Sequence, residues 1–404
     1  MTDVQPVLNN PTGCPVVDYA DLNVPMAPAG WHFDNFDAKR EEAPIHTGEG
    51  GGQQYFLLTR MDDIRKAYQN TDVFSNSAVT VADPNPAYRW IPEMLDGHLH
   101  TAWRQMLTPL WSPGSIDKMK PKLRQRFGEV LDDIAQRGEC DIVTDVALLF
   151  PNVIFMDLMG LPRADAAQFQ QWEMDILHGD RTSAGSGDRR MAAMMAVVGY
   201  FVELIAERRK SPSDDLLSFV LSKQIDGEDI PEQDLLDFCL LMFMAGLDTV
   251  ATQITFNFWH LATHPDDRQR LLAQPELWPT AIEELLRYYA FVTPSRKVLH
   301  DTEILGCPVA AGTMVHLPLV SGNRDPRAFD DADKVVIDRQ SNRHIAFGAG
   351  PHRCLGVNLA REELLVAMTM WHERIPNYRI APGFEVEEHG GQVGIGSLKV
   401  VWDV

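Results

Sequence analysis

The sequence has few positive charges, few cysteines and no long uninterrupted apolar run. Its 57 Asp and Glu residues outnumber its 36 Lys and Arg residues, which gives a formal net charge of -21. A negative field of this size repels nucleic acid phosphates and anionic lipid headgroups, so we expect neither as a partner. The five cysteines contain no C-x-x-C spacing, which excludes a structural zinc cluster of that type.

Targeting and membrane-spanning signals are also missing. The first ten residues, MTDVQPVLNN, have neither the basic start nor the apolar stretch of a signal peptide. The most apolar window, residues 191–206, is interrupted by Glu203 and is shorter than the roughly 20 residues that cross a bilayer. We therefore expect a cytoplasmic protein with no membrane partner.

The composition is that of a globular protein, with 45% hydrophobic and 23% charged residues. Apolar residues recur at helical spacing from about residue 98 to residue 290, whereas short β-like runs follow after residue 292. No linker or repeat divides the chain. These patterns predict one mainly α domain over residues 1–404 with a minor β part. The many prolines of residues 1–30 predict an extended N-terminal arm, since proline breaks helices.

Individual elements follow from the same periodicities. Residues 233–262 predict one long helix, and its apolar middle, CLLMFMAGL, predicts burial on every side. The expected strands lie at 53–59, 296–305 and 313–317. The other expected helices lie at 62–70, 98–111, 115–136, 142–159, 163–178, 188–209, 214–224, 265–274, 276–290 and 355–373.

The segment 347–356, FGAGPHRCLG, contains the strongest chemical signal. Its three glycines allow the backbone to run flat against a large planar group. Cys354 precedes a predicted helix, where exposed N–H groups and the helix dipole stabilise a thiolate. A thiolate at such a place suits haem iron and favours cleavage of the O–O bond of dioxygen. A lone cysteine is more often a small buried hydrophobe, and a dinucleotide loop fails because Arg353 replaces its third glycine.

This segment resembles F-G-x-G-x-H-x-C-x-G, the haem-binding signature of the cytochrome P450 monooxygenases. The resemblance implies a triangular-prism fold with a long central helix across the haem. It further implies haem b, iron protoporphyrin IX with an axial thiolate, bound by Cys354 and contacted by Phe347 and Gly348. The implied function is insertion of one oxygen atom from dioxygen into a C–H bond of a small apolar substrate.

Glu284 and Arg287 stand three residues apart in EELLR, so they share one helix face. Taken alone, they indicate a surface ion pair that contributes about 0.2 to 0.5 kcal/mol. The family resemblance instead implies a buried structural pair, joined by an arginine that Arg339 resembles.

Asp248 and Thr249 follow Ala245-Gly246-Leu247 in the long helix. Polar groups in an apolar helix centre are costly unless satisfied, and a threonine can satisfy itself by bonding the carbonyl one turn back, which bends the helix. The alternative without a catalytic role is that Asp248 and Thr249 only satisfy their own polar groups through local hydrogen bonds. The segment is similar to the oxygen-activating motif of the family, which implies that Asp248 and Thr249 handle protons during catalysis.

Four basic side chains resemble the residues that hold the two haem propionates in this family. His100 and Arg104 are four apart in HTAWR and share a helix face, although an amphipathic surface helix would look the same. Arg296 and His352 complete the implied set, and an arginine matches a carboxylate bidentately.

Within the family, the chain is most similar to the soluble bacterial camphor hydroxylases. Tyr88 resembles the tyrosine that bonds the substrate ketone there, and Leu241, Met244 and Val292 match positions that line the substrate cavity. Met244 replaces a valine, and Pro294 replaces an aspartate near a propionate. The pocket should therefore differ in shape, and a terpenoid or norisoprenoid ketone other than camphor is the implied substrate.

The sequence contains no flavin or nicotinamide motif, so electrons must come from a partner. The resemblance implies a [2Fe-2S] ferredoxin reduced by a flavoprotein reductase. Arg353 and Arg361, beside Cys354, are the expected docking charges, although surface arginines are usually only solvated. Two other functions use the same thiolate haem: a peroxide-driven peroxygenase, and a non-catalytic haem-thiolate sensor or carrier.

Overall fold

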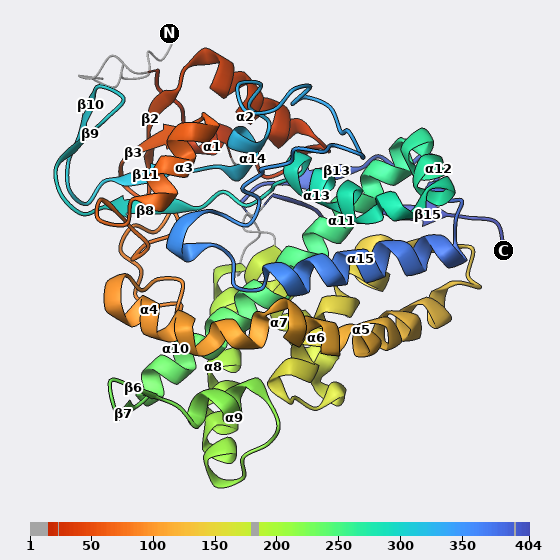
Figure 1. Ribbon diagram of the computed structural model, residues 1–404, viewed down its shortest axis with the longest axis horizontal. Coiled ribbons are helices and arrows are strands. Elements are labelled where there is room, and N and C mark those ends of the chain that lie inside the picture. The colour runs from red at the N-terminus through yellow and green to blue at the C-terminus, as the bar shows by residue number, and fades with distance from the viewer. Residues whose placement is uncertain (1–14, 23, 179–185, 392) are drawn as a thin grey trace.

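The computed structural model describes residues 15–22, 24–178, 186–391 and 393–404. Helices dominate these residues, and the mainly α fold class with a minor β part is confirmed (Figure 1). The α-helices are α1 Tyr19–Leu22, α2 Trp31–Glu42, α3 Met61–Gln69, α4 Gly97–Leu107, α5 Pro113–Ile134, α6 Leu149–Met159, α7 Ala166–Glu173, α8 Ser186–Lys210, α9 Leu216–Leu221, α10 Glu232–Gly246, α11 Asp248–Thr263, α12 Pro265–Ala273, α13 Trp278–Tyr288, α14 Leu319–Asn323 and α15 Val357–Arg374. Two π-helical segments, η2 Val143–Ala147 and η4 Met174–His178, adjoin α6 and α7.

The strands form small sheets. The largest has the order β2-β3-β11-β8-β4, in which β3 and β11 are parallel and the other neighbours are antiparallel. The strands are β1 Ala27–Pro28, β2 Ile45–Gly50, β3 Gln53–Leu58, β4 Phe74–Ser75, β5 Glu139–Asp141, β6 Gln224–Ile225, β7 Glu228–Asp229, β8 Ser295–Val298, β9 Thr302–Ile304, β10 Cys307–Val309, β11 Met314–His316, β12 Arg379–Ile380, β13 Glu387–His389, β14 Gly394–Ile395 and β15 Lys399–Val401.

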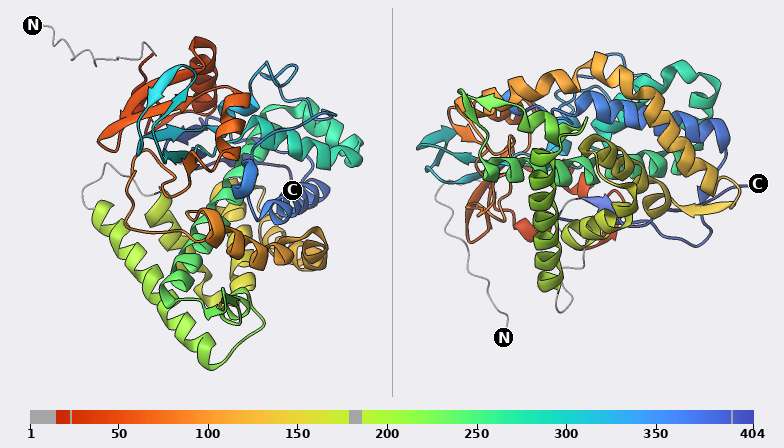
Figure 2. Two further views of the ribbon diagram at one scale, coloured as in Figure 1. Left: turned by 60° about the vertical axis from the view of Figure 1, so that its left-hand side comes forward. Right: turned by 90° about the horizontal axis from the view of Figure 1, so that it is seen from below.

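The five-stranded sheet lies apart from most of the helices (Figure 1). Figure 1 shows this sheet with α2 and α3 on one side, while α4 to α10 lie on the other and α11 and α15 run between them. Helix α11 is buried along nearly its whole length and packs on α15, as in the edge-to-face contact of Phe258 with Trp371 at 4.9 Å between ring centroids. Figure 2 shows α8 as a long straight helix at the rim of the body.

The prediction of one long helix over residues 233–262 is wrong in one respect, because the structure divides this stretch into two helices. Helix α10 ends at Gly246, Leu247 has φ −95° and ψ −63°, and α11 begins at Asp248. Burial on every side is also wrong, since Ala245 and Gly246 are exposed. The combined stretch Glu232–Thr263 is long and apolar enough to cross a membrane, but 61% of its window is buried inside the molecule, as in a core helix.

The described part of the N-terminal arm, which was expected to be extended over residues 1–30, contains one short helical turn and one short strand. Tyr19–Leu22 form one helical turn, and the Asp18 carboxylate accepts a hydrogen bond from the Ala20 amide at 2.9 Å. Ala27–Pro28 pair with β13 as strand β1. The prolines in this region are far enough apart to leave room for a single turn between them. Residues 1–14 and 23 lie outside the described residues.

Candidate active site

A tight loop before α15 presents Cys354. The Cys354 amide donates to the Phe347 carbonyl at 2.8 Å, and the Gly348 amide donates to the Ile345 carbonyl at 2.7 Å. Gly350 has φ +70°, and a Cβ there would stand 2.5 Å from the Tyr68 carbonyl oxygen. A side chain at residue 350 would therefore be strained and would clash, which explains the second glycine of the FGAGPH segment.

The thiol of Cys354 is exposed, whereas His352 and Val357 on either side of it are buried. Although solvent reaches this thiol, the protein packed around it removes part of its hydration and raises its pKa, while the Gly356 amide and the positive charges of Arg104 and Arg353 lower the pKa in part. The thiolate stabilisation expected at a helix start is thus outweighed in the protein alone. A bound metal ion deprotonates a coordinating thiol.

Two arginines near Cys354 have no ion-pair partner among the residues that the structure describes. Neither Arg104 nor Arg296 makes an ion pair with any of the described residues. Arg296 is 3% exposed, its Nη1 donates to the Ser295 carbonyl at 2.8 Å, and its guanidinium lies over the Tyr68 ring at 4.7 Å. A buried guanidinium without an anion is unfavourable, so this pair of arginines fits an anionic ligand.

The two histidines expected near the propionates lie together. The rings of His100 and His352 stack at 3.9 Å between centroids. Burial and the nearby charges of His352 and Arg104 lower the pKa of His100 to about 4, so its imidazole is neutral at pH 7. The buried Nδ1 atom of His352 has no hydrogen-bond partner among the described residues. Such an atom fits a polar ligand at this position.

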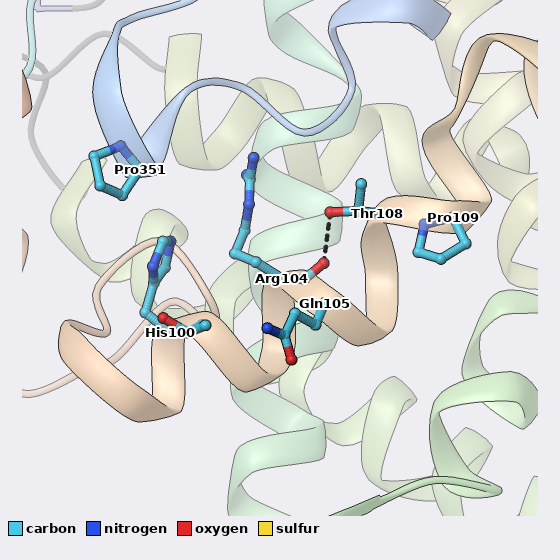
Figure 3. Close-up of a pocket in the computed structure, with 7 residues that line it drawn as sticks. His100, Arg104, Gln105, Thr108, Pro109 and Pro351 are labelled. Carbon is cyan, nitrogen blue, oxygen red and sulfur yellow. Dashed lines mark hydrogen bonds between the residues drawn. The ribbon is translucent and has the colours of Figure 1, made fainter.

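Figure 3 shows His100 and Arg104 reaching from α4 toward the segment that carries Pro351. A cavity of about 460 Å3 lies there, and Gln105, Thr108 and Pro109 also line it. The Thr108 hydroxyl donates to the Arg104 carbonyl at 2.6 Å, which closes the last turn of α4. Two propionate residues expected from sequence are therefore on one face of one helix.

Two acidic residues of this region were missed by the sequence analysis. The pKa of Glu93 is raised by burial and lowered in part by Arg296 and His352, which places its carboxyl among the basic side chains. Asp96 accepts from His352 Nε2 at 3.4 Å and from the Asn76 amide at 3.3 Å. Their sequence signal is proximity to His100, where only basic side chains were expected.

Asp248 and Thr249 lie at the break between α10 and α11. The Thr249 hydroxyl donates to the Ala245 carbonyl at 2.9 Å, one turn back, and Asp248 is 1% exposed. The expected backbone bond of the threonine is present. Because Ala245 and Gly246 just before it are exposed within a buried helix, the break opens onto space that a ligand can enter.

Glu284 and Arg287 form a buried ion pair rather than a surface pair. Both are 0% exposed, and Arg287 donates twice to the Glu284 carboxylate, each time at 2.8 Å. Arg339 Nε donates to the same carboxylate at 2.9 Å. Further donors are the Val336 amide at 2.8 Å and Asn342 Nδ2 at 3.1 Å, so the carboxylate is fully satisfied.

The expected substrate residues come from three segments. Tyr88 is half-buried with its ring 5.0 Å from that of Trp90, Leu241 is buried on α10, and Met244 and Val292 are half-buried. Burial raises the pKa of Tyr88, so its hydroxyl stays a hydrogen-bond donor.

The two expected docking arginines differ from each other. Arg353 is exposed. Arg361 instead donates through Nε and Nη2 to the Glu283 carboxylate, both at 2.6 Å, and its guanidinium lies 5.2 Å from the centre of the Phe347 ring. Burial would raise the pKa of Glu283, but the hydrogen bonds from His344 and Arg361 lower it to about 2. The guanidinium of Arg361 is thus occupied by an ion pair within the protein, with Glu283.

Comparison with known proteins settles the family. The cytochrome P450 family model matches residues 26–374. The chain belongs to the cytochrome P450 family. It is 35% identical over 364 residues to a probable cytochrome P450 127A1 of Sinorhizobium fredii, which covers 89% of this chain and 86% of that protein. A mycinamicin IV hydroxylase/epoxidase of Micromonospora griseorubida is 31% identical, with 87% of this chain and 90% of that protein covered.

Solved cytochrome P450 structures agree over nearly the whole chain. CYP101C1 has a TM-score of 0.86 at 29% identity and covers 96% of this chain and 98% of its own. CYP101J2 has the same TM-score at 25% identity, with 96% and 97% covered. The resemblance to the camphor-type group and the cytochrome P450 fold are confirmed. The enzyme is a haem-thiolate monooxygenase, with haem b as its cofactor.

The site residues fit this haem. Cys354 offers an exposed thiol, and Ala245 and Gly246 leave room on the central helix. Within the described residues Arg104 and Arg296 offer positive charge that no ion pair neutralises, and the buried Nδ1 of His352 has no partner there. A flat group with two carboxylates satisfies these requirements together.

Proposed function

We propose that this cytochrome P450 hydroxylates a small, mostly apolar ketone of the terpenoid or norisoprenoid class in the cytoplasm. The observation that carries the proposal is one half-buried hydroxyl, that of Tyr88, with apolar Leu241, Met244 and Val292 as the other expected lining. Such a pocket binds its ligand by apolar burial and orients it through one hydrogen bond.

The roles of the residues follow from their positions. Cys354 would hold the iron, and Arg104, Arg296, His100 and His352 would bind the propionates. When bound, the haem supplies the chemistry that activates dioxygen. The Thr249 hydroxyl and the Asp248 carboxyl, at the helix break, would carry protons to the reacting oxygen. Apolar walls exclude water from the reaction.

The substrate test compares ketones with the hydrocarbons of the same skeleton. We expect each ketone to shift the spin state of the haem at a lower concentration than the corresponding hydrocarbon. Tyr88→Phe should weaken ketone binding about fivefold, because it removes one hydrogen bond that contributes about 1 kcal/mol. Hydrocarbon binding by Tyr88→Phe should match the wild type. Equal loss for ketones and hydrocarbons would exclude the hydrogen bond from Tyr88.

For electron supply we propose a [2Fe-2S] ferredoxin with its flavoprotein reductase, docked against the exposed Arg353 beside the cysteine loop. A rim charge mainly controls association, so Arg353→Glu should raise the ferredoxin KM roughly tenfold and leave the haem spectrum unchanged. Arg379, exposed on the separate sheet β12-β15-β5, is the matched control.

Arg361 was expected to share this docking role. Because it pairs with Glu283, Arg361→Glu would place two carboxylates together and disturb the cysteine loop as well as docking. A changed haem spectrum in Arg361→Glu would support the local role, and an unchanged spectrum with slower ferredoxin turnover would support docking.

The presence of Asp248 and Thr249 favours dioxygen over peroxide as the oxidant. A peroxygenase need not protonate dioxygen, and a sensor or carrier needs no proton delivery. Product formed with ferredoxin, reductase and NADH supports the monooxygenase; product formed only with hydrogen peroxide, or none at all, supports one of the two alternatives.

A further inference from the structure

A second carboxyl is buried in the same region as Asp248. Glu173, the last residue of α7, is 1% exposed, like Asp248. We propose that Glu173 is a proton donor of this enzyme, which passes its proton to the Asp248 carboxylate. The inference rests on the proton-carrying role proposed above for Asp248 and Thr249.

The packing of α7 directs Glu173 toward the helix break. Phe169, four residues earlier on α7, shares its helix face and is fully buried. The Phe169 ring contacts Phe155 at 5.9 Å and Phe243 of α10 at 5.8 Å between centroids. Phe155 in turn lies 3.5 Å from where a Cβ of Gly246 would stand. This aromatic cluster therefore joins the Glu173 face of α7 to the chain two residues before Asp248.

The surroundings of Glu173 favour its protonated form. Neither carboxyl oxygen has a hydrogen-bond partner among the described residues, and the neighbouring side chains of this face are aromatic. Burial and the negative charge of Asp248 raise the pKa of Glu173 well above its usual value. A buried carboxyl with no hydrogen-bond donor beside it and a negative charge nearby favours its neutral form, so Glu173 holds a proton that it can give up.

The transfer balances without any added reagent. The O–H bond of the Glu173 carboxyl breaks, the proton joins an Asp248 carboxylate oxygen directly or through one water, and Glu173 is left ionised. Solvent returns a proton to Glu173 between turnovers. The π-helical segment η4 begins at the next residue, Met174, and π-helical turns recur at functional sites.

Infrared spectroscopy of the resting holoenzyme tests the protonation without turnover. Glu173→Gln should remove one C=O stretching band of a protonated carboxylic acid. Glu363 provides an internal reference, because burial raises its pKa to about 8 and its band should therefore disappear as the pH rises past 8. A spectrum in which Glu173→Gln removes no such band would overturn the proposal.

Turnover measurements test whether Glu173 supplies protons to the reaction. In Glu173→Gln, product formation should fall by roughly 10²-fold with a larger solvent isotope effect, the range for loss of a positioned donor. Glu173→Asp, which keeps a carboxyl, should recover part of the rate. Asp175→Asn is the matched control, since it removes a carboxylate of η4 that is not buried.

A double variant shows whether Glu173 acts through Asp248 or independently of it. If Glu173 acts through Asp248, then Glu173→Gln added to Asp248→Asn should slow turnover little further. Independent multiplication of the two losses would overturn the relay. A carbon monoxide spectrum without the thiolate signature would instead overturn the enzyme assignment itself, so the two failures are distinguishable.

Discussion

Arg104 and Arg296 have no ion-pair partner in the described parts of the chain, which distinguishes this site from an ordinary protein interior. Most charged groups in the described chain have partners, as Arg361 has Glu283 and Arg287 has Glu284. Arg296 is buried, as Arg287 is, and yet has no carboxylate within ion-pair distance among the described residues. Single residues therefore indicate where an anionic cofactor binds, before any comparison with other proteins.

Thr249 and Thr255 allow a matched test of proton delivery. Both hydroxyls donate to the carbonyl four residues earlier at 2.9 Å, so either substitution removes the same backbone bond. Thr249→Ala should lower product per NADH about tenfold and divert electrons to peroxide, because a positioned donor is lost. Thr255→Ala should keep the wild-type yield. Product and peroxide per NADH, measured in both variants, decide the question, and equal yields in the two would contradict the role.

At the scale of elements, periodicity predicted most helices and the strand at 53–59, since apolar spacing reports the face that each element buries. The bend that the Thr249 hydroxyl causes by bonding the Ala245 carbonyl was expected, but the sequence did not show that the helix would be interrupted at Leu247. A helix interior of Leu, Met and Ala looks uniformly buried in sequence, whereas exposure of Ala245 and Gly246 depends on what faces them.

The sequence predicted residues of the candidate site only where they stand in a recognisable pattern. Cys354, His100 and Arg104 stand in recognisable patterns, and the structure brings His100 to His352. Glu173 could not be found in this way, because an isolated acid in sequence gives no sign that the residues around it in the fold will bury it.

The cysteine loop depends on close backbone approach at Gly350. Gly350→Ala should destabilise the protein by about 1 to 3 kcal/mol, since the alanine would hold a strained φ of +70° and meet the Tyr68 carbonyl. Haem retention should fall as well, because Cys354 would move. Gly114→Ala is the control, for nothing lies within 4 Å of its Cβ position. Urea unfolding and haem content measure both effects; an unaffected Gly350→Ala would show that the loop adapts.

The buried pair on α13 holds the segment between α14 and the cysteine loop. Arg287 donates to the carbonyls of Asn323, Ala332 and Lys334, at 2.8, 2.9 and 2.7 Å. Glu284→Gln should cost about 3 to 5 kcal/mol, because it leaves the buried Arg287 and the half-buried Arg339 without their anion. Chemical denaturation checks the value. A loss below 1 kcal/mol, as for an exposed pair, would contradict the structural role.

At the scale of the whole molecule, buried histidines set the acid limit of stability. Burial lowers the pKa of His316 to about 4 and of His372 to about 3. His372 is satisfied while neutral, since its Nδ1 donates to the Met368 carbonyl at 2.6 Å and its Nε2 accepts from the Tyr378 hydroxyl at 3.2 Å.

The direction of the pH effect follows from these pKa values. Between about pH 6.5 and pH 3 or 4 the unfolded chain binds protons that the folded histidines do not, so stability falls as the pH falls. Each histidine contributes a slope of up to about 1.4 kcal/mol per pH unit. Denaturant unfolding at pH 7, 6 and 5 should show this loss, and His372→Gln should reduce its slope. An identical slope in His372→Gln would contradict the assignment.

The account depends most on the bond between Cys354 and haem iron. The direct measurement is the carbon monoxide difference spectrum of the reduced protein, taken for the wild type and for Cys354→Ser. We predict the red-shifted Soret band of a thiolate-ligated haem in the wild type and its loss in Cys354→Ser. A wild-type protein that binds no haem, or a Cys354→Ser protein that keeps the same band, would contradict the account.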